Sequence, residues 1–240
     1  DPASKDIAVH EVGHSFSSLA DEYYAGDNYA AEKANMTAQT NPATVKWTNW
    51  MGYNGTGIIQ HCCGGNSATW YKPHASCKMN FLASPFCSVC SQAFIETIHS
   101  KVNPIVSYSP PGPIANSPNQ FATFKLTKVM KTVPNSLRTI WTLDGNIVAE
   151  NVDSFVLDQS LLSDGTHFLN ANLIDTTYLL RVNNHTNIHN SLVHWSINKN
   201  NVGIDWQSNR SKISCSVYPN PTSQTMHISL ELEKNSTVLI

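Results

Sequence analysis

The fold is decided by the stretch Asp6-Ile7-Ala8-Val9-His10-Glu11-Val12-Gly13-His14-Ser15-Phe16-Ser17-Ser18-Leu19-Ala20-Asp21-Glu22-Tyr23. His10, Glu11 and His14 form the pattern HExxH. On a helix, positions i and i+4 share a face, so both imidazoles are able to reach one Zn²⁺ ion. Glu11 points beside the metal, where its carboxylate takes a proton from a zinc-activated water as the general base. We therefore predict a helix whose apolar contacts come from Ile7, Val9 and Phe16.

A catalytic zinc site needs a third protein ligand, and Asp21 is the favoured candidate. In a continuous helix, Asp21 would lie ~10 Å beyond His14 and out of reach of the same ion. The Asp21 hypothesis therefore also predicts that the helix ends near Ser17-Ser18 and that the chain turns back. Glu32 is the main rival, because another class of HExxH enzymes takes its third ligand from a later helix. The remaining alternatives are Glu22, His61 and His74.

Composition excludes several classes of partner. Of the 240 residues 41% are hydrophobic and 13% are charged, and the formal net charge is −2. Such a balance argues against nucleic-acid binding and against a polybasic membrane patch. The apolar runs fall far short of the ~20 residues that a membrane span requires. Because the chain opens on Asp1-Pro2 without an initiator Met, we expect a piece of a longer protein.

The distribution of turn residues divides the chain into regions. Ser109-Pro110-Pro111-Gly112-Pro113 is rich in Pro and Gly and is predicted to be a linker, residues 109–113. It follows an α+β region, residues 1–108, and precedes a run of short strands over residues 114–200 that predicts an immunoglobulin-like β-sandwich. The predicted strands are Phe121–Val129, Thr139–Leu143, Asn146–Ala149, Ser154–Leu157, His167–Leu173, Leu179–Val182 and Leu192–Ile197, with tight turns at Asp144-Gly145 and Asp164-Gly165.

The six cysteines are unevenly placed. Five lie between Cys62 and Cys90, and Cys215 stands alone downstream. Cys87 and Cys90 form a CxxC pair that, with Cys77 and the adjacent Cys62-Cys63, is able to build either a structural zinc site or two disulfides. We favour disulfides, because the C-terminal segment argues for export, and we expect one of the two adjacent cysteines to stay free or bond elsewhere.

The stretch from His10 to Tyr23 resembles the zinc motif of the bacterial IgA peptidase family, HExGHxxxxLxDEY. Further matching pieces follow in order: Asn35-Met36-Thr37, Trp47-Thr48-Asn49-Trp50, Gly64-Gly65, Tyr71-Lys72-Pro73, Cys77-Lys78-Met79 and Phe86-Cys87-Ser88-Val89-Cys90. The resemblance implies zinc, hydrolysis of peptide bonds and Asp21 as third ligand. It also implies the C-terminal part of a metzincin-like peptidase domain, with Met79 in a tight turn beneath the metal and a C-terminal helix over residues 86–101.

The sequence departs from the family pattern at three points. Ser17 and Ser18 stand where relatives often carry Gly, which makes the turn after the helix harder to form. Lys72 stands where Arg is common, which would weaken a bidentate contact at that point. The sheet and helix that precede the zinc helix in such domains are missing, so we expect this fragment itself to be inactive. The alternative hypothesis is a surface adhesin or binding protein with a vestigial metal motif.

The segment over residues 213–240 resembles the start of a type IX secretion sorting domain. It contains Tyr218-Pro219-Asn220-Pro221, followed by a strand pattern from Met226 to Leu230. The alternative is an ordinary Asn-Pro turn before a hairpin. The resemblance implies a bacterial protein that is secreted or attached to the cell surface. We therefore expect a secreted zinc endopeptidase that acts on proteins or peptides.

Overall fold

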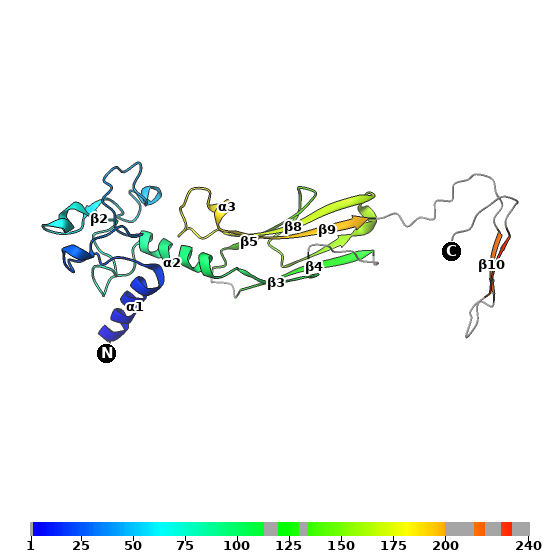
Figure 1. Ribbon diagram of the computed structural model, residues 1–240, viewed down its shortest axis with the longest axis horizontal. Helices are drawn as coiled ribbons and strands as arrows, with labels where there is room; N and C mark the ends of the chain where they lie inside the picture. The colour runs from blue at the N-terminus through cyan, green and yellow to red at the C-terminus, as the bar shows by residue number, and fades with distance from the viewer. Residues whose placement is uncertain (1, 113–119, 130–133, 200–213, 219–226, 232–240) are drawn as a thin grey trace. The chain divides into compact units, whose positions relative to one another are not determined.

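The computed structural model describes residues 2–112, 120–129, 134–199, 214–218 and 227–231 (Figure 1). The chain divides into two compact units, Asp1–Asn200 and Asn201–Ile240. Helices and several antiparallel sheets are both present, as expected of an α+β protein. None of the helices in these described ranges is long and apolar enough to cross a membrane.

The first helix, α1 (Pro2–Ser17), buries a face that is mostly polar. His10, Gly13 and Ser17 are buried on this face, as their spacing of three and four residues requires. The expectation that Ile7 and Val9 supply apolar contacts is wrong, since they are 46% and 38% exposed. The histidines occupy the inward face, so Val9, one position from His10, points outward. Phe16 does pack as expected.

The helix ends at Ser17, as predicted. Ser18 adopts φ 52°, in the left-handed region, and its N–H donates to the carbonyl of His14 at 3.0 Å. The N–H of Leu19 then donates to the carbonyl of Gly13 at 3.1 Å. The chain thus turns back along the helix instead of continuing its axis, and Leu19 is buried beneath it. This reversal brings the following residues back toward His10.

Loops and short elements connect α1 to the second helix, α2 (Ser88–Lys101). They comprise η1 (Asp27–Tyr29), η2 (Thr48–Trp50), η3 (Asn66–Thr69) and a two-stranded sheet of β1 (Ile59–Gln60) and β2 (Tyr71–Lys72). The ring of Phe16 stacks on Phe94 of α2 at 5.9 Å. A shared apolar core consists of Leu19, Val45, Trp47, Trp50, Cys77, Met79, Cys87, Val89, Cys90 and Ala93.

A tight turn over residues 77–81 supports α1 from below. The N–H groups of Asn80 and Phe81 both donate to the carbonyl of Cys77 at 2.8 Å. Met79 within this turn is fully buried. A methyl group added at Gly13 would lie only 2.7 Å from the Met79 sulfur, so the absence of a side chain at Gly13 permits the close approach. Met79 therefore packs directly under the HExxH segment.

The remaining strands of the first unit form two antiparallel sheets. The sheet order is β3-β4-β7 in one and β6-β5-β8-β9 in the other. The strands are β3 (Ile105–Ser109), β4 (Phe121–Lys128), β5 (Leu137–Leu143), β6 (Asn146–Glu150), β7 (Ser154–Asp158), β8 (Gly165–Asp175) and β9 (Asn190–Lys199). Alternate residues of both sheets point into one core, so the sheets form a sandwich. At its centre Trp141 stacks on Trp195 at 5.8 Å.

The strand predictions fail at two places. Leu179–Val182 is not a strand, because the N–H of Arg181 donates to the side chain of Gln92 rather than to a neighbouring strand. Conversely, β3 was not predicted. Its last residue, Ser109, is also the first residue of the predicted linker. The indole of Trp195 donates to the carbonyl of the next residue, Pro110, at 2.9 Å. The start of the predicted linker is therefore attached to the sandwich, whose first strand begins before residue 114.

Two further short elements complete the first unit, η4 (Gln159–Leu161) and α3 (His185–Ile188). In the second unit β10 (Ser214–Tyr218) pairs antiparallel with β11 (His227–Glu231). The second of these strands overlaps the strand pattern predicted from Met226 to Leu230. The turn motif Pro219-Asn220-Pro221 lies outside the described residues.

Candidate metal centre

The structure brings His10, His14 and Asp21 together. The Nε2 atoms of the two histidines lie 3.1 Å apart, and Oδ1 of Asp21 lies 3.0 Å from the first and 3.1 Å from the second. Donors on one tetrahedral zinc, at ~2.0–2.1 Å from the ion, would be ~3.3 Å apart. The three ligand atoms therefore stand at about the separation of three corners of one coordination tetrahedron.

Backbone carbonyls orient both imidazoles toward this point. Nδ1 of His10 donates to the carbonyl of Lys78 at 3.0 Å, and Nδ1 of His14 donates to the carbonyl of Leu19 at 2.8 Å. Lys78 lies in the turn over residues 77–81, and Leu19 lies in the segment that reverses direction after α1. A carbonyl partner on Nδ1 places the proton there and leaves Nε2 as a lone pair, which is the tautomer of a metal ligand.

The convergence of these atoms fits a cation. With both Nδ1 atoms protonated, two Nε2 lone pairs and one carboxylate oxygen face one another with no proton between the imidazoles. His10 is buried, so water screens this arrangement poorly. Two neutral imidazoles and a carboxylate are also a ligand set that zinc accepts, with a fourth position left open. The residues present therefore fit a zinc ion.

A small pocket opens beside this cluster. Its volume is about 200 Å³, and it is lined by Ile7, His10, Glu11, Tyr23, Asn80 and Leu82. Burial, and then the negative charges of Asp21 and Glu11, raise the pKa of the Tyr23 phenol. Tyr23 therefore keeps its proton at neutral pH and offers an O–H donor in the pocket that also contains Glu11.

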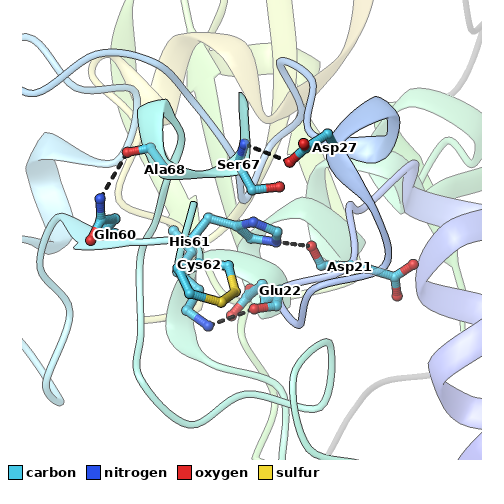
Figure 2. The surroundings of a disulfide bond; sticks show 10 residues. Asp21, Glu22, Asp27, Gln60, His61, Cys62, Ser67 and Ala68 are labelled. Atoms are coloured by element: carbon cyan, nitrogen blue, oxygen red, sulfur yellow. Dashed lines mark hydrogen bonds between the residues drawn. A yellow bond between two sulfur atoms is a disulfide. The ribbon is translucent and has the colours of Figure 1, made fainter. Parts of the chain in front are cut away.

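The rival third ligands lie elsewhere. Glu32 accepts hydrogen bonds from Thr37, the Ala38 N–H and Lys46 at the protein surface. His74 bonds to the carbonyl of Asn54. His61 approaches Asp21 but reaches its backbone carbonyl, at 3.0 Å, while the carboxylate of Asp21 points away from it (Figure 2). These side chains are therefore not part of the His10–His14–Asp21 cluster.

Glu22 belongs to a second buried cluster that sequence reasoning did not assemble. Its carboxylate lies with the thiols of Cys77, Cys87 and Cys90, and all four side chains are buried. Burial raises the pKa of Glu22 to about 8. The spacing of the cysteines in the sequence indicates a cluster. Glu22 follows Asp21 directly, and from the sequence it is a candidate for the HExxH site alone.

The cysteine pairing differs from the disulfide prediction. Cys77, Cys87 and Cys90 are free thiols, and the one disulfide among the described side chains joins the neighbours Cys62 and Cys63 (Figure 2). The expectation that one of these two stays free or bonds elsewhere is wrong. Cys62 and Cys63 lie in the loop after β1, whereas Cys77, Cys87 and Cys90 lie in the core that packs against α1 and α2.

Comparison with known protein families gives one match. Residues 2–59 match the family described as IgA Peptidase M64. The match includes the HExxH helix and Asp21, and it relates this part of the chain to a family of peptidases. No curated protein and no solved structure matches the chain.

Proposed function

We propose that the chain carries a zinc-dependent endopeptidase centre, in which His10, His14 and Asp21 hold the metal and Glu11 is the general base. The observation that supports this most strongly is the convergence of three ligand atoms at 3.0–3.1 Å from one another, with Nδ1 of both histidines bonded to backbone carbonyls. The match of residues 2–59 to a peptidase family is consistent with it.

Each residue of the pocket has a defined task in this proposal. A bound zinc ion supplies Lewis acidity, which polarises a peptide carbonyl and lowers the pKa of water. Glu11 accepts the proton of the attacking water and delivers it to the leaving amine. Tyr23, which lines the same pocket as Glu11, donates a hydrogen bond from its phenol O–H to the carbonyl oxygen of the scissile peptide. The Lys78 and Leu19 carbonyls keep both imidazoles in the ligand tautomer.

The substrate class is protein or peptide. The description of the matched family mentions IgA, but no residue in the pocket identifies a particular protein substrate. We also propose that the β3–β9 sandwich is immunoglobulin-like. Its three-plus-four sheet order and the fully buried Trp141 on its third strand support this assignment.

We further propose that the protein is secreted by a bacterium or attached to its surface. The sequence of residues 213–240, with its likeness to a type IX sorting domain, motivates this proposal. The pairing of β10 with β11 is compatible with the strand pattern of such a domain.

The deciding experiment separates catalysis from metal binding. Because the family resemblance implies further elements ahead of the zinc helix, the assay uses a chain extended upstream of Asp1. We expect this extended chain, loaded with zinc, to cleave an unfolded protein substrate, with products identified by mass spectrometry. Glu11→Gln should abolish cleavage, a loss of 10²-fold or more, while zinc content stays the same. Asp21→Ala should lose the zinc of this site, because two imidazoles alone bind it weakly.

Glu32→Gln is the matched control, since it changes the rival carboxylate without touching the cluster. It should keep both zinc and cleavage. Zinc lost in Glu32→Gln but kept in Asp21→Ala would overturn the ligand assignment. A zinc-loaded extended chain that cleaves no peptide bond, or cleaves equally well after Glu11→Gln, would refute the peptidase proposal in favour of a binding protein.

A further inference from the structure

The second buried cluster joins three segments that are distant in sequence. Cys77 lies in the turn under α1, Cys87 is the N-cap residue of α2, and Cys90 lies in the first turn of that helix. Glu22 comes from the segment after Asp21. One ligand atom from each of the four lies within 4.8 Å of those of the other three.

The sulfur spacing fits a shared metal ion. The Sγ atoms of Cys77 and Cys90 lie 3.6 Å apart. Thiolates on one tetrahedral zinc, with Zn–S bonds of ~2.3 Å, stand ~3.8 Å apart. A disulfide requires ~2.05 Å between sulfurs, and a third cysteine would then remain without a partner. An odd number of cysteines in one buried cluster therefore favours a metal over disulfides.

Glu22 supplies the fourth ligand. Its side chain is completely buried, and Oε1 accepts from Asn35 at 2.9 Å and lies 3.4 Å from Sγ of Cys90. Oε2 has no hydrogen-bond partner among the described residues. A buried carboxylate oxygen without a partner is costly unless a cation meets it. Three sulfurs and a carboxylate oxygen of Glu22 complete a four-coordinate set.

Hydrogen-bond donors and positive charge surround the cluster. Sγ of Cys77 accepts a hydrogen bond from the N–H of Cys87 at 3.3 Å. Cys87 and Cys90 stand at the N-terminus of a 14-residue helix, where the backbone dipole favours negative charge. The buried ammonium of Lys72 donates to the backbone carbonyl of Glu22 at 2.5 Å and so lies beside the anionic set.

We propose that Cys77, Cys87, Cys90 and Glu22 form a second, structural zinc site. All four ligands are buried, so no position is open to a substrate, which is the pattern of a structural rather than a catalytic zinc. The site fastens the turn under α1 to the start of α2. Through Glu22, whose N–H donates to the Met79 carbonyl at 2.7 Å, it also fixes the residue next to Asp21.

Metal content of matched variants tests this proposal independently of catalysis. Purified under reducing conditions with excess zinc and then desalted, the chain should retain about two zinc ions. Asp21→Ala should retain about one, Cys87→Ser should retain about one, and the double variant none. Replacing Cys62 and Cys63 together with Ser is the control and should leave both ions bound.

A spectroscopic measurement covers the case in which Cys87→Ser does not fold. Cobalt loaded into Asp21→Ala, which keeps every cysteine, should give the sulfur-to-metal charge-transfer absorption of a thiolate-bound ion. Oxidised Cys77 and Cys90 with one zinc in the unaltered chain would overturn the proposal, and so would cobalt in Asp21→Ala without a thiolate band. A failed peptidase assay affects neither readout.

Discussion

At the residue scale, the turn at Ser18 brings Asp21, the proposed third zinc ligand, back to His10 and His14. Ser18 adopts φ 52°, a conformation that costs a residue with a side chain ~1–2 kcal/mol, whereas Gly adopts it freely. Ser18→Gly relieves this cost but adds ~0.5–1 kcal/mol of unfolded-chain entropy. We therefore expect Ser18→Gly to raise the free energy of unfolding by ~0.5–1 kcal/mol, measured by urea denaturation of the zinc-loaded chain.

Ser15→Gly is the control for Ser18→Gly. Ser15 is an exposed residue inside α1, where Gly costs ~0.5 kcal/mol relative to Ser. The two substitutions remove the same atoms and should shift the urea midpoint in opposite directions. A midpoint that falls in both variants would contradict the idea that backbone conformation limits the turn at Ser18.

At the element scale, one hairpin turn in the sandwich makes stability depend on pH. Asp144 and Gly145, with φ 49° and 83°, join β5 to β6, and the carboxylate of Asp144 contacts Nδ1 of His167 on β8 at 2.6 Å. Nε2 of His167 lies 2.9 Å from the carbonyl of Ser163. Both ring nitrogens thus face oxygen acceptors, which suits the protonated imidazolium.

The direction of the pH effect follows from the pKa shifts of this pair. The hydrogen bond to Asp144 raises the pKa of His167 above 6.5, so its contribution to stability is complete below pH 6.5 and is lost as the pH rises through the folded-state pKa. The hydrogen bond from His167 lowers the pKa of Asp144 below 3.8, so its contribution is lost only in stronger acid. The pair therefore stabilises the fold most between about pH 4 and 6.5.

Asp144→Asn tests this window and retains a residue that tolerates positive φ. The difference in urea midpoint between the unaltered chain and Asp144→Asn should be largest between about pH 4 and 6.5 and should shrink at higher pH. Asp164→Asn, at a nearby exposed position, should give a difference that does not follow this profile. A difference for Asp144→Asn that grows above pH 7 would show that His167 is not the partner that titrates.

The same elements show what the sequence could predict. Asp144-Gly145 was recognisable as a turn because its residue types alone favour positive φ. The helix end at Ser17 was predictable because Asp21 could not otherwise reach His10 and His14. Leu179–Val182 was misassigned as a strand, because the hydrogen-bond partner of Arg181 lies 89 residues away on α2. The pairing of Cys62 with Cys63 was missed because spacing alone does not fix disulfide connectivity.

At the scale of the whole first unit, Arg181 joins the sandwich to the part that contains the His10–His14–Asp21 cluster. Its guanidinium lies 3.8 Å from the ring centre of Tyr53 and 4.5 Å from that of Trp50. The backbone N–H of Arg181 donates to Oε1 of Gln92 at 2.9 Å, and the indole N–H of Trp50 donates to the same oxygen at 2.7 Å. A second contact pairs His99 of α2 with Asp175 of β8 at 3.1 Å. The stability of the two parts is therefore coupled.

Arg181→Ala should weaken this coupling, because it removes the stacked guanidinium and leaves the backbone hydrogen bond to Gln92 in place. Each cation–π contact contributes ~0.5–2 kcal/mol, so we expect the free energy of unfolding to fall by ~1–2 kcal/mol. Hydrogen exchange followed by mass spectrometry should then speed up over residues 47–53 and 177–183, while the interior strand β8 keeps its protection. Arg138→Ala is the control, since the guanidinium of Arg138 pairs with exposed Glu150 on the neighbouring strand, and this substitution should change neither segment. Faster exchange over residues 177–183 alone would show that Arg181 stabilises its own loop without linking the sandwich to the part that contains the His10–His14–Asp21 cluster.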